Sequence, residues 1–429
     1  MFARAKKLVP EPVKNAYHFL QALFGALIFL FPSRKIKVIG VTGTDGKTTT
    51  VHLIYHILKE AGKKVSMIST VEARVGDKSI DTGFHVTTPD PIRVQSLLRK
   101  MVNARSEYAV LETTSHGLAQ ERVAFVQFFA GIITNVTHEH LDYHKTYENY
   151  LAAKAKLLRG VKFRILNADD PAFEGLKDQG SGQLVSFGLE QQADFIAKRI
   201  KLEKQSSEFE IDFTDKQKKN QKIKINLPLV GKYNIYNLLA AFATAVSLEV
   251  EPGEIASVIT SFKGVPGRMQ YIDEGQKFDC VIDFAHTPAS LNTALEALNS
   301  FKRGKIIAVF GCAGERDKAK RPLMGKIATQ LADYSIFTAE DPRGEKVNDI
   351  IEQIAKGALE VGGIPNRTFW KIADRAEAIN TAIQTLASDG DTVAIFGKGH
   401  EQSMSIGGKE FPWSDEAVAR NALQLKLKK

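Results

Sequence analysis

The sequence predicts an α/β fold: a short apolar N-terminal helix, a central P-loop domain on a parallel sheet, and a C-terminal Rossmann-like α/β domain. Three observations predict it. Apolar strands alternate with amphipathic helices from residue 36 to about 261, a second series of the same kind begins near residue 267, and a glycine-rich loop joins the first strand to the first helix. This rhythm is typical of parallel sheets that helices cover on both faces.

The composition is that of a globular protein in a reducing compartment. Of the 429 residues, 44% are hydrophobic and 25% are charged, which excludes a disordered chain, a collagen-like fibre and a disulfide scaffold. Cys280 and Cys312 lie in apolar runs without a CxxC spacing, so we expect no structural zinc site. The net charge of +9 is scattered along the chain. We interpret it chiefly as ordinary solvated surface charge, with attraction to phosphorylated substrates or anionic lipid as the alternative, and we expect no nucleic-acid partner.

Residues 1–35 differ from the rest of the chain. Residues 16–31 are nearly all apolar and have basic residues on both sides. A helix of this length spans roughly 24 Å, less than the ~30 Å core of a bilayer, and no signal-peptide cleavage site follows. The segment could lie on a membrane surface, pack on the protein, or form a dimer. The spacing of Leu20, Leu23, Leu27 and Leu30 predicts that a leucine face packs against the central domain.

The central domain is expected over residues 36–263. Residues 200–225 alternate in polarity around a polar stretch, which predicts a hairpin. The other strands are predicted at 36–41, 65–69, 108–111 and 130–135, and the helices at 48–60, 90–103 and 147–158.

The second domain is expected over residues 264–429, after a glycine- and proline-containing hinge at 263–267. Its strands are predicted at 278–283, 305–310, 334–338 and 392–396, and its helices at 288–299, 324–331, 347–359 and 373–387.

Residues 41–50 follow a predicted strand and open a predicted helix. In this position the backbone N–H groups can bind phosphates, and the helix N-terminus adds positive potential. Lys47 would lie against the outer phosphates, and the Thr48 hydroxyl would face Mg²⁺. The usual pattern has glycine where Val41 stands. The loop is therefore a variant phosphate-binding loop.

Polar residues follow three predicted strands, at the edge where an open parallel sheet binds its ligands. These runs are residues 87–90, 112–116 and 135–144. Glu112 comes directly after an apolar strand and is well placed as an oxygen ligand for Mg²⁺. The last run has three interpretations: a zinc cluster, a capped turn, or part of a mixed Mg²⁺–nucleotide site, which we favour. Its metal-binding side chains are His138, His140, Asp142 and His144.

Eight motifs occur in the order found in the Mur ligases, and the chain resembles this family over about residues 36–425. The motifs are Gly43-Thr-Asp-Gly-Lys-Thr-Thr, Glu112-Thr-Thr-Ser-His-Gly-Leu, Asn135-Val-Thr-His-Glu-His-Leu-Asp-Tyr-His, Gly231-Lys-Tyr-Asn-Ile-Tyr-Asn, Asp283-Phe-Ala-His-Thr-Pro, Gly314-Glu-Arg-Asp-Lys-Ala-Lys-Arg-Pro, Glu340-Asp-Pro-Arg and Gly397-Lys-Gly-His-Glu. The resemblance is to the branch that adds the third amino acid, usually meso-diaminopimelate, to UDP-N-acetylmuramoyl-L-alanyl-D-glutamate. It implies a cytoplasmic, ATP-dependent amide ligase of cell-wall synthesis that uses two Mg²⁺ ions and an acyl phosphate.

The resemblance also implies site residues. Those that bind ATP would be Gly43, Thr44, Asp45, Gly46, Lys47, Thr48, Thr49, Asn234, Asn237, Arg268, Asp283 and His286. Those that bind the muramoyl dipeptide would be Thr87, Thr88, Thr114, Gln120 and Arg122. Those that bind the amino acid would be Arg316, Glu340, Asp341, Pro342, Arg343, Gly397 and Glu401. The metal ligands would be Thr48, Glu112, His140 and Lys154, the last as a carbamate. The catalytic residues would be Lys47, Lys154 and His140.

The chain departs from the family pattern at two places that bear on its substrates. Glu340 and Asp341 replace Asp-Asn before Pro342-Arg343, which concerns the choice of amino acid. The short apolar segment stands where the family has a separate uridine-binding domain. Two alternatives stay open: a relative that amidates or extends a lipid-linked muropeptide, and a nucleotide-regulated, membrane-associated binding protein without ligase turnover. The former typically carries a four-cysteine zinc insertion, and the two isolated cysteines of this chain count against it. Glu340-Asp-Pro-Arg and the Thr-Thr-Pro run at residues 87–89 point away from a folylpolyglutamate synthetase.

Overall fold

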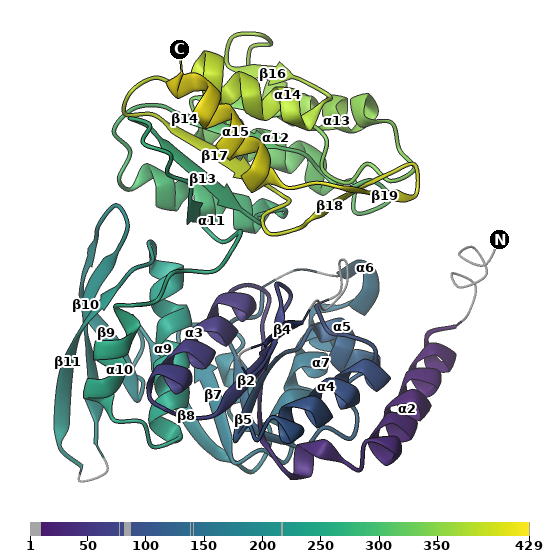
Figure 1. The fold of residues 1–429 in the computed structure, drawn as a ribbon, viewed down its shortest axis with the longest axis vertical. Helices are drawn as coiled ribbons and strands as arrows, with labels where there is room; N and C mark the ends of the chain where they lie inside the picture. Colours follow the sequence, from purple (N-terminus) through teal and green to yellow (C-terminus); the bar gives the residue numbers. More distant parts are fainter. Residues whose placement is uncertain are drawn as a thin grey trace. The chain divides into compact units, whose positions relative to one another are not determined.

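The computed structural model describes residues 10–76, 78–80, 87–137, 139, 141–215 and 218–428 (Figure 1). The chain divides into two compact units, Met1–Lys263 and Gly264–Lys429. Each unit is built on a mainly parallel sheet with helices packed on it. The α/β fold class predicted from the sequence is therefore confirmed.

The first unit holds one sheet, which has 11 strands within the described residues, in the order β11-β10-β9-β8-β7-β6-β1-β5-β2-β3-β4. The strands are β1 (Lys37–Thr42), β2 (Val65–Ile68), β3 (Ala73–Val75), β4 (Lys78–Ile80), β5 (Tyr108–Glu112), β6 (Phe128–Ile133), β7 (Phe163–Asn167), β8 (Gln183–Gly188), β9 (Phe195–Leu202), β10 (Ser207–Thr214) and β11 (Asn220–Leu227). The helices are α2 (Glu11–Ile28), α3 (Lys47–Glu60), α4 (Pro91–Asn103), α5 (Ser115–Ala119), α6 (Leu141–His144), α7 (Tyr147–Ala155), α8 (Phe173–Leu176), α9 (Lys232–Ser247) and α10 (Pro252–Ile259), with 3₁₀ turns at Pro32–Arg34 and Lys156–Leu158.

Strand β1 lies between β5 and β6 and runs parallel to both. Parallel neighbours end at the same edge of a sheet, so the segments that follow them meet there. Strand β1 ends at Thr42, β5 at Glu112 and β6 at Ile133. The phosphate loop, Glu112 and the loop after β6 therefore share one edge.

Helices pack on this sheet and bury most of its central strands: all of β5, and all but the first residues of β1 and β6. Val94, Leu97 and Leu98 of α4 join Val38 and Leu111 of the sheet in one apolar cluster. Helices α3 and α9 contact each other, and they pack against β5 and β7 respectively (Figure 1). These helices pack beside the strands whose ends form the sheet edge that carries the phosphate loop and Glu112.

Strands β9, β10 and β11 extend the sheet as an antiparallel ribbon. The hairpin predicted at 200–225 corresponds to β10 and β11, and the burial of β10 alternates, with Ser207, Phe209 and Ile211 facing inward. Strands β7 and β8 and helix α9 are additional elements that the periodicity did not predict.

The second unit has a sheet in the order β12-β13-β17-β14-β15-β16, parallel except for the pair β12–β13, and a hairpin of β18 and β19. Its strands are β12 (Gln270–Tyr271), β13 (Asp279–Asp283), β14 (Ile306–Phe310), β15 (Tyr334–Phe337), β16 (Phe369–Lys371), β17 (Thr392–Phe396), β18 (Ser403–Ile406) and β19 (Lys409–Pro412). Its helices are α11 (Pro288–Asn299), α12 (Lys320–Leu331), α13 (Val347–Glu360), α14 (Arg375–Asn380), a π-helical segment (Thr381–Leu386) and α15 (Asp415–Leu427).

The core of the second unit forms where its central strands meet α14 and α15. Ile282, Val309 and Ile395 come from three neighbouring strands, and Ile379 and Leu423 come from the two helices. The predicted elements of this unit occur in the predicted order. Strand β16 and the hairpin of β18 and β19 are additional, because their exposed or short segments carry little periodic signal.

Helix α2 packs on the first unit with the opposite face to the one predicted. Leu20, Leu27 and Leu30 are 62%, 54% and 69% exposed, whereas Ala22 and Ala26 are fully buried. The prediction that the leucine face packs inward is therefore wrong. Among the described residues, no helix has the length and hydropathy that a membrane span needs.

Small residues explain this orientation, since they let α2 come close to α4. A Cβ on Gly25 would lie only 3.2 Å from the Cα of Ile92. At the end of α2, the guanidinium of Arg99 donates hydrogen bonds to the carbonyl oxygen of Phe29. Close backbone packing thus takes precedence over the burial of the largest apolar side chains.

Candidate active site

The phosphate loop between β1 and α3 has a conformation that needs glycine. Gly46 has φ +80°, and a Cβ there would lie 2.1 Å from Oδ1 of Asn237. The backbone N–H groups of Thr44 and Asp45 donate to Oδ1 of Asn135, at 3.1 and 2.9 Å. The Nζ of Lys47 donates to the carbonyl oxygens of Gly43 and Thr44, at 3.0 and 2.6 Å. The loop is compact, and its lysine lies over it.

Glu112 is the buried carboxylate of the site, with 1% of its surface exposed. The Thr48 hydroxyl donates to its Oε1 at 3.0 Å. Thr70 donates to Oε2 through its backbone N–H at 2.8 Å, and its hydroxyl lies 2.9 Å from Oε1. A hydroxyl and a carboxylate are the hard oxygen ligands that Mg²⁺ prefers.

The third expected metal ligand, His140, lies outside the described residues, as does His138. In the part of the chain that the structure describes, no group of three or more His, Cys, Asp or Glu side chains could hold a metal ion. Thr48 and Glu112 are the two described residues at this edge that we expect to bind a cation.

Lys154 is a fully buried lysine on α7. Its Nζ has no hydrogen-bond partner among the described residues and lies 4.4 Å from the centre of the Tyr150 ring. Burial, and next the charge of Lys47, holds the pKa of Lys154 well below its ordinary value. Lys156 differs, because its Nζ forms a 2.5 Å ion pair with Glu121 at the surface.

The residues expected to bind the dipeptide are partly linked to one another. The hydroxyls of Thr88 and Thr114 lie 3.2 Å apart, and the N–H of Thr114 donates to the Thr88 hydroxyl at 2.9 Å. Arg122 donates to the carbonyl oxygen of Thr88 at 3.1 Å. The hydroxyls of Thr70 and Thr87 lie 3.1 Å apart, so this group adjoins Glu112.

The residues expected to bind the nucleotide fall into two groups. Asn237 of α9 adjoins the phosphate loop at Gly46, and its Nδ2 donates to Oδ1 of Asn234 at 3.1 Å. Arg268, Asp283 and His286 belong to the second unit. There the guanidinium of Arg268 lies 4.3 Å from the centre of the Phe284 ring, and Asp283 accepts the N–H groups of residues 269 and 285.

A cavity of about 600 Å³ adjoins the loop after β15. Pro342 and Arg343 line it together with Lys346 and Ile406. The backbone of Arg343 is bound to β18, because its N–H donates to the carbonyl oxygen of Ser405 at 2.9 Å. Of the other residues expected at the amino-acid pocket, Arg316 is exposed on the loop after β14.

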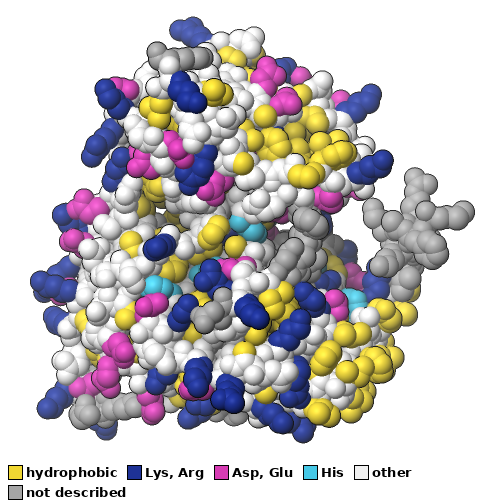
Figure 2. All heavy atoms as spheres, viewed as in Figure 1, with side chains coloured by type: hydrophobic (Ala, Val, Ile, Leu, Met, Phe, Trp, Pro, Cys, Tyr) yellow, Lys and Arg dark blue, Asp and Glu magenta, His cyan; other side chains and the backbone are white. Residues whose placement is uncertain are grey.

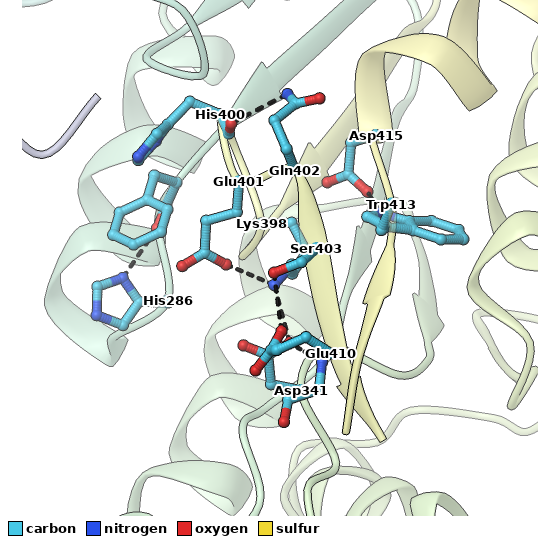
Figure 3. Close-up of polar contacts among 12 residues, drawn as sticks. His286, Asp341, Lys398, His400, Glu401, Gln402, Ser403, Glu410, Trp413 and Asp415 are labelled. Carbon is cyan, nitrogen blue, oxygen red and sulfur yellow. Dashed lines mark hydrogen bonds and ion pairs between the residues drawn. The ribbon is translucent and has the colours of Figure 1, made fainter. Parts of the chain in front are cut away.

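Lys398 lies at the centre of a buried ion network (Figure 3). Its side chain is fully buried, and its Nζ lies 2.8 Å from Oδ1 of Asp341 and 2.5 Å from Oε2 of Glu401. Oδ1 of Asp341 also accepts the N–H of Ser405 at 2.9 Å. Asp341 and Glu401, both expected to bind the amino acid, are therefore held in place by a lysine that was not predicted as a site residue.

Glu340 is the least satisfied carboxyl of the second unit. It is 6% exposed, and its Oε2 has no hydrogen-bond partner among the described residues. Burial raises the pKa of Glu340 to about 7. A Cβ on Gly397 would lie 3.1 Å from this oxygen, so glycine at that position leaves room for the carboxyl.

Sequence reasoning missed Thr70 and Lys398. Thr70 follows directly after β2, the parallel neighbour of β5, so its position at a strand end was a usable signal. Lys398 stands inside a recognised motif three residues before Glu401, but nothing in the sequence indicates that its side chain is buried and also meets Asp341, which is distant in the chain.

Two family models match the chain: the Mur ligase middle domain at residues 41–245, and the Mur ligase glutamate ligase domain at residues 267–399. The chain is 37% identical to the UDP-N-acetylmuramoyl-L-alanyl-D-glutamate–2,6-diaminopimelate ligase of Syntrophomonas wolfei, over 95% of the chain and 82% of that protein. Identity to the ligase of the same name from Geobacillus thermodenitrificans is also 37%, over 97% and 84%.

The fold is similar to a solved structure with the same name. That structure, of a UDP-N-acetylmuramoyl-L-alanyl-D-glutamate–2,6-diaminopimelate ligase, superimposes with a TM-score of 0.64 and 29% identity. The match covers 91% of this chain and 79% of the other.

Proposed function

The chain belongs to the Mur ligase family, and from this premise we propose that it is the ATP-dependent ligase that adds diaminopimelate to UDP-N-acetylmuramoyl-L-alanyl-D-glutamate during peptidoglycan precursor synthesis. One observation carries the proposal. The phosphate loop and the Thr48–Glu112 pair lie at one edge of the sheet, and the buried Lys154 adjoins Tyr150, whose hydroxyl lies 3.0 Å from that of Thr44 in the loop. Relatives with 37% identity over most of their length bear this name.

In the first step, a carboxylate oxygen of the acceptor attacks the γ-phosphorus of ATP. The bond between the γ-phosphorus and the bridging oxygen breaks, which gives an acyl phosphate and ADP. Lys47 and the loop N–H groups would bind the phosphates and offset the repulsion between two anions. Thr48 and Glu112 would hold Mg²⁺, which neutralises phosphate charge when bound.

In the second step, the amino group of the incoming amino acid attacks the acyl carbon. The bond between carbon and phosphate oxygen breaks, phosphate leaves, and the nitrogen loses a proton. The cavity beside Arg343 is where we expect the amino acid to bind. A guanidinium presents a planar pair of N–H donors that suits the second carboxylate of diaminopimelate.

We also propose that Lys154 reacts with carbon dioxide to form a carbamate. The neutral amine attacks the carbon of CO₂, an N–C bond forms while one C–O π bond opens, and the nitrogen releases one proton. A neutral amine thus becomes an anionic carbamate, whose oxygens would bind a second cation. Support comes from the burial of Nζ, its lack of a hydrogen-bond partner among the described residues, and its depressed pKa. A buried ammonium in this position would be costly.

The exposed apolar face of helix α2 is the support for a further part of the proposal: this ligase acts in the cytoplasm and contacts the inner face of the membrane. Large apolar side chains gather over α2 on one face of the molecule (Figure 2). The exposed members are Val13, Tyr17, Phe19, Leu20, Phe24, Leu27, Ile28 and Leu30. Exposed Arg34 and Lys35 follow the helix and suit anionic lipid. This face is also the observation that favours a second candidate, a ligase for a lipid-linked muropeptide.

An assay matrix tests the proposal. UDP-linked and lipid-linked acceptors are each offered with diaminopimelate, with lysine and with no amine, and phosphate release and product mass are measured. We expect phosphate release only with the UDP-linked dipeptide and diaminopimelate together. Turnover with the lipid-linked acceptor alone would establish the second candidate, and no turnover in any combination would contradict both.

Arg343→Lys tests the amino-acid side of the proposal. The variant keeps the charge but loses the planar fork, so the preference for diaminopimelate over lysine should fall about 10- to 100-fold in kcat/KM. Lys346→Arg, which changes the other cation of the cavity, is the matched control and should leave the preference intact. An unchanged preference in Arg343→Lys would mean that the second carboxylate binds elsewhere.

A further inference from the structure

The face of α2 that packs on the rest of the protein carries polar residues in its first half and small residues in its second half. Residues 11, 15, 18, 22 and 25 follow at spacings of four and three, so they lie on one face of the helix. Ala22 and Gly25 form the half that packs on α4. Glu11, Asn15 and His18 form the polar half, which small-residue packing does not explain.

This polar half lies beside residues of the acceptor site. The charges of Arg122 and Asp90 act on His18, whose pKa is lowered first by burial. Glu11 acts electrostatically on Tyr143, which is hydrogen-bonded to Gln120. Asn15 lies between Glu11 and His18 on the same face. Phe19 of α2 also lies 5.0 Å, ring centre to ring centre, from Phe125, three residues after Arg122. The beginning of α2 therefore lies near the segment that carries Gln120 and Arg122.

Two residues of α2 and two of the neighbouring segment each carry an unsatisfied polar atom. Asn15 Oδ1, His18 Nδ1, Gln120 Oε1 and Arg122 Nε are buried and have no hydrogen-bond partner in the described part of the chain. Buried polar atoms are nearly always hydrogen-bonded, so each exception calls for an explanation. All four residues are only half-buried as a whole, so a ligand can reach these atoms after small rotations of the side chains.

The unsatisfied atoms specify the chemistry of that ligand. Among the described residues, Arg122 donates only to the neutral carbonyl oxygen of Thr88, so its remaining N–H suits an anionic oxygen. The amide oxygens of Asn15 and Gln120 can only accept, so they suit hydroxyl or amide N–H groups. His18 can serve in either role. Hydroxyl, amide and acid groups occur together in an N-acetylated amino sugar that carries an acid.

We propose that α2 forms one wall of the acceptor site and that Asn15 and His18 bind the sugar end of the muramoyl acceptor. This inference rests on the proposed function. Thr88 and Thr114 lie next to the edge where the acceptor carboxylate reacts, Arg122 is bonded to Thr88, and α2 lies beyond Arg122. An extended acceptor would therefore meet α2 with the end that is far from the reacting carboxylate.

The test uses Asn15→Leu and His18→Leu in the full chain, singly and together. Leucine removes the polar atoms, and its helix propensity is higher than that of asparagine or histidine, so the substitutions do not weaken the helix itself. We expect the KM for UDP-N-acetylmuramoyl-L-alanyl-D-glutamate to rise about 5-fold in each single variant, which corresponds to the loss of about one hydrogen bond. The kcat and the KM values for ATP and for the amino acid should stay unchanged. His18→Asn, which keeps a polar atom, should restore part of the loss.

Lys100→Leu is the control, since Lys100 is an exposed residue of the neighbouring helix α4. An unchanged acceptor KM in the double variant, with a melting temperature like that of wild type, would overturn the inference. Calorimetric binding of UDP-N-acetylmuramate without ATP separates the two proposals, because it needs no turnover. Wild-type binding that the double variant loses supports the α2 site even if the ligase assay fails, and equal binding by both contradicts it.

Discussion

Two of the lysines that the structure describes are fully buried, and their surroundings shift their pKa values in opposite directions. Burial and Lys47 lower the pKa of Lys154, which has no carboxylate within hydrogen-bond distance among the described residues. For Lys398 burial acts in the same direction, but Glu401 and Asp341 outweigh it and raise the pKa. A buried cation without a partner is so costly that the neutral form prevails. Lys154 is therefore suited to chemical modification and Lys398 to structure.

Lys154→Ala should remove most of the ligase activity, because no other described side chain can replace a carbamate at that position. Short carboxylates such as acetate or formate, added in solution, should restore part of it by occupying the space left. Lys156→Ala is the matched control, as it removes an ion pair with Glu121, which contributes about 0–1 kcal/mol, and a 3.3 Å hydrogen bond to the carbonyl oxygen of Leu118. Equal activity of the two variants would remove the assignment of Lys154.

Glu340 should make the second unit less stable as the pH rises. Its pKa is about 7 in the folded chain against an ordinary value of 4.5, so the folded state binds the proton more tightly. The contribution of this group to stability is therefore largest below about pH 4.5 and is lost by about pH 7. The free energy of unfolding of wild type should therefore fall by on the order of 2 kcal/mol over this pH range, and Glu340→Gln should not show this fall.

The measurement is urea unfolding at pH 5 and pH 8, followed by tryptophan fluorescence. Trp370 and Trp413 are the two tryptophans of the chain, and both lie in the second unit. Glu345→Gln is the control, because the hydrogen bonds of Arg321 hold the pKa of Glu345 at about 2, and its effect should be the same at both pH values. A pH dependence in Glu340→Gln like that of wild type would contradict the prediction.

At the scale of secondary-structure elements, α2 is unusual because it buries small side chains and exposes large ones. The buried side includes Ala22 and Ala26, and the exposed side includes Leu20 and Leu27. An exposed apolar stripe of this kind, followed by basic residues, is typical of helices that lie in the plane of a membrane interface. Under the two proposals above, one face of this element would meet lipid and the other would meet the acceptor.

Leu27→Glu should weaken binding to vesicles that contain phosphatidylglycerol. Removing a buried leucine from the interface and adding a charge that anionic lipid repels should reduce co-sedimentation at least about 10-fold. Leu359→Glu on α13 is the matched control, since both leucines are 54% exposed. The mass of the free protein is measured alongside by light scattering. Wild-type protein that ignores these vesicles, or a dimer that Leu27→Glu dissociates, would contradict the membrane assignment.

At the scale of the whole molecule, the residues proposed for the nucleotide are divided between two compact units. The phosphate loop belongs to the first unit, and Arg268, Asp283 and His286 belong to the second. A ligand that binds only the folded state stabilises every unit that contacts it. Thermal unfolding can therefore report which units contribute to nucleotide binding.

A non-hydrolysable ATP analogue with Mg²⁺, at 100 times its Kd, should stabilise the chain by about 2.7 kcal/mol. We expect the transitions seen by circular dichroism, which reports both units, and by tryptophan fluorescence, which reports the second, to move upward together. Lys47→Ala should abolish both shifts. A shift of the first unit alone would contradict the roles assigned to Arg268, Asp283 and His286.

The sequence by itself determined the order of strands and helices, the phosphate loop and the residue types at the strand ends. These features depend on local periodicity and on turn chemistry, which neighbouring residues carry. Glu112, for example, could be placed at the sheet edge simply because it follows an apolar strand. The predicted helix at 288–299 coincides with α11, Pro288–Asn299, where a capping box and a proline mark the start.

Only the tertiary structure decided which face of α2 is buried, and which partners Lys154 and Lys398 have. The leucine spacing of α2 predicted the wrong face, because a periodic pattern shows that a helix has an apolar stripe but not whether a neighbour can approach it. Ala22 and Gly25 allow the backbone of α4 to come close, and that closeness depends on the surface of α4. The charge state of a buried lysine likewise depends on the carboxylates around it. Folding brings Asp341 to Lys398, and their separation along the chain does not reveal that contact.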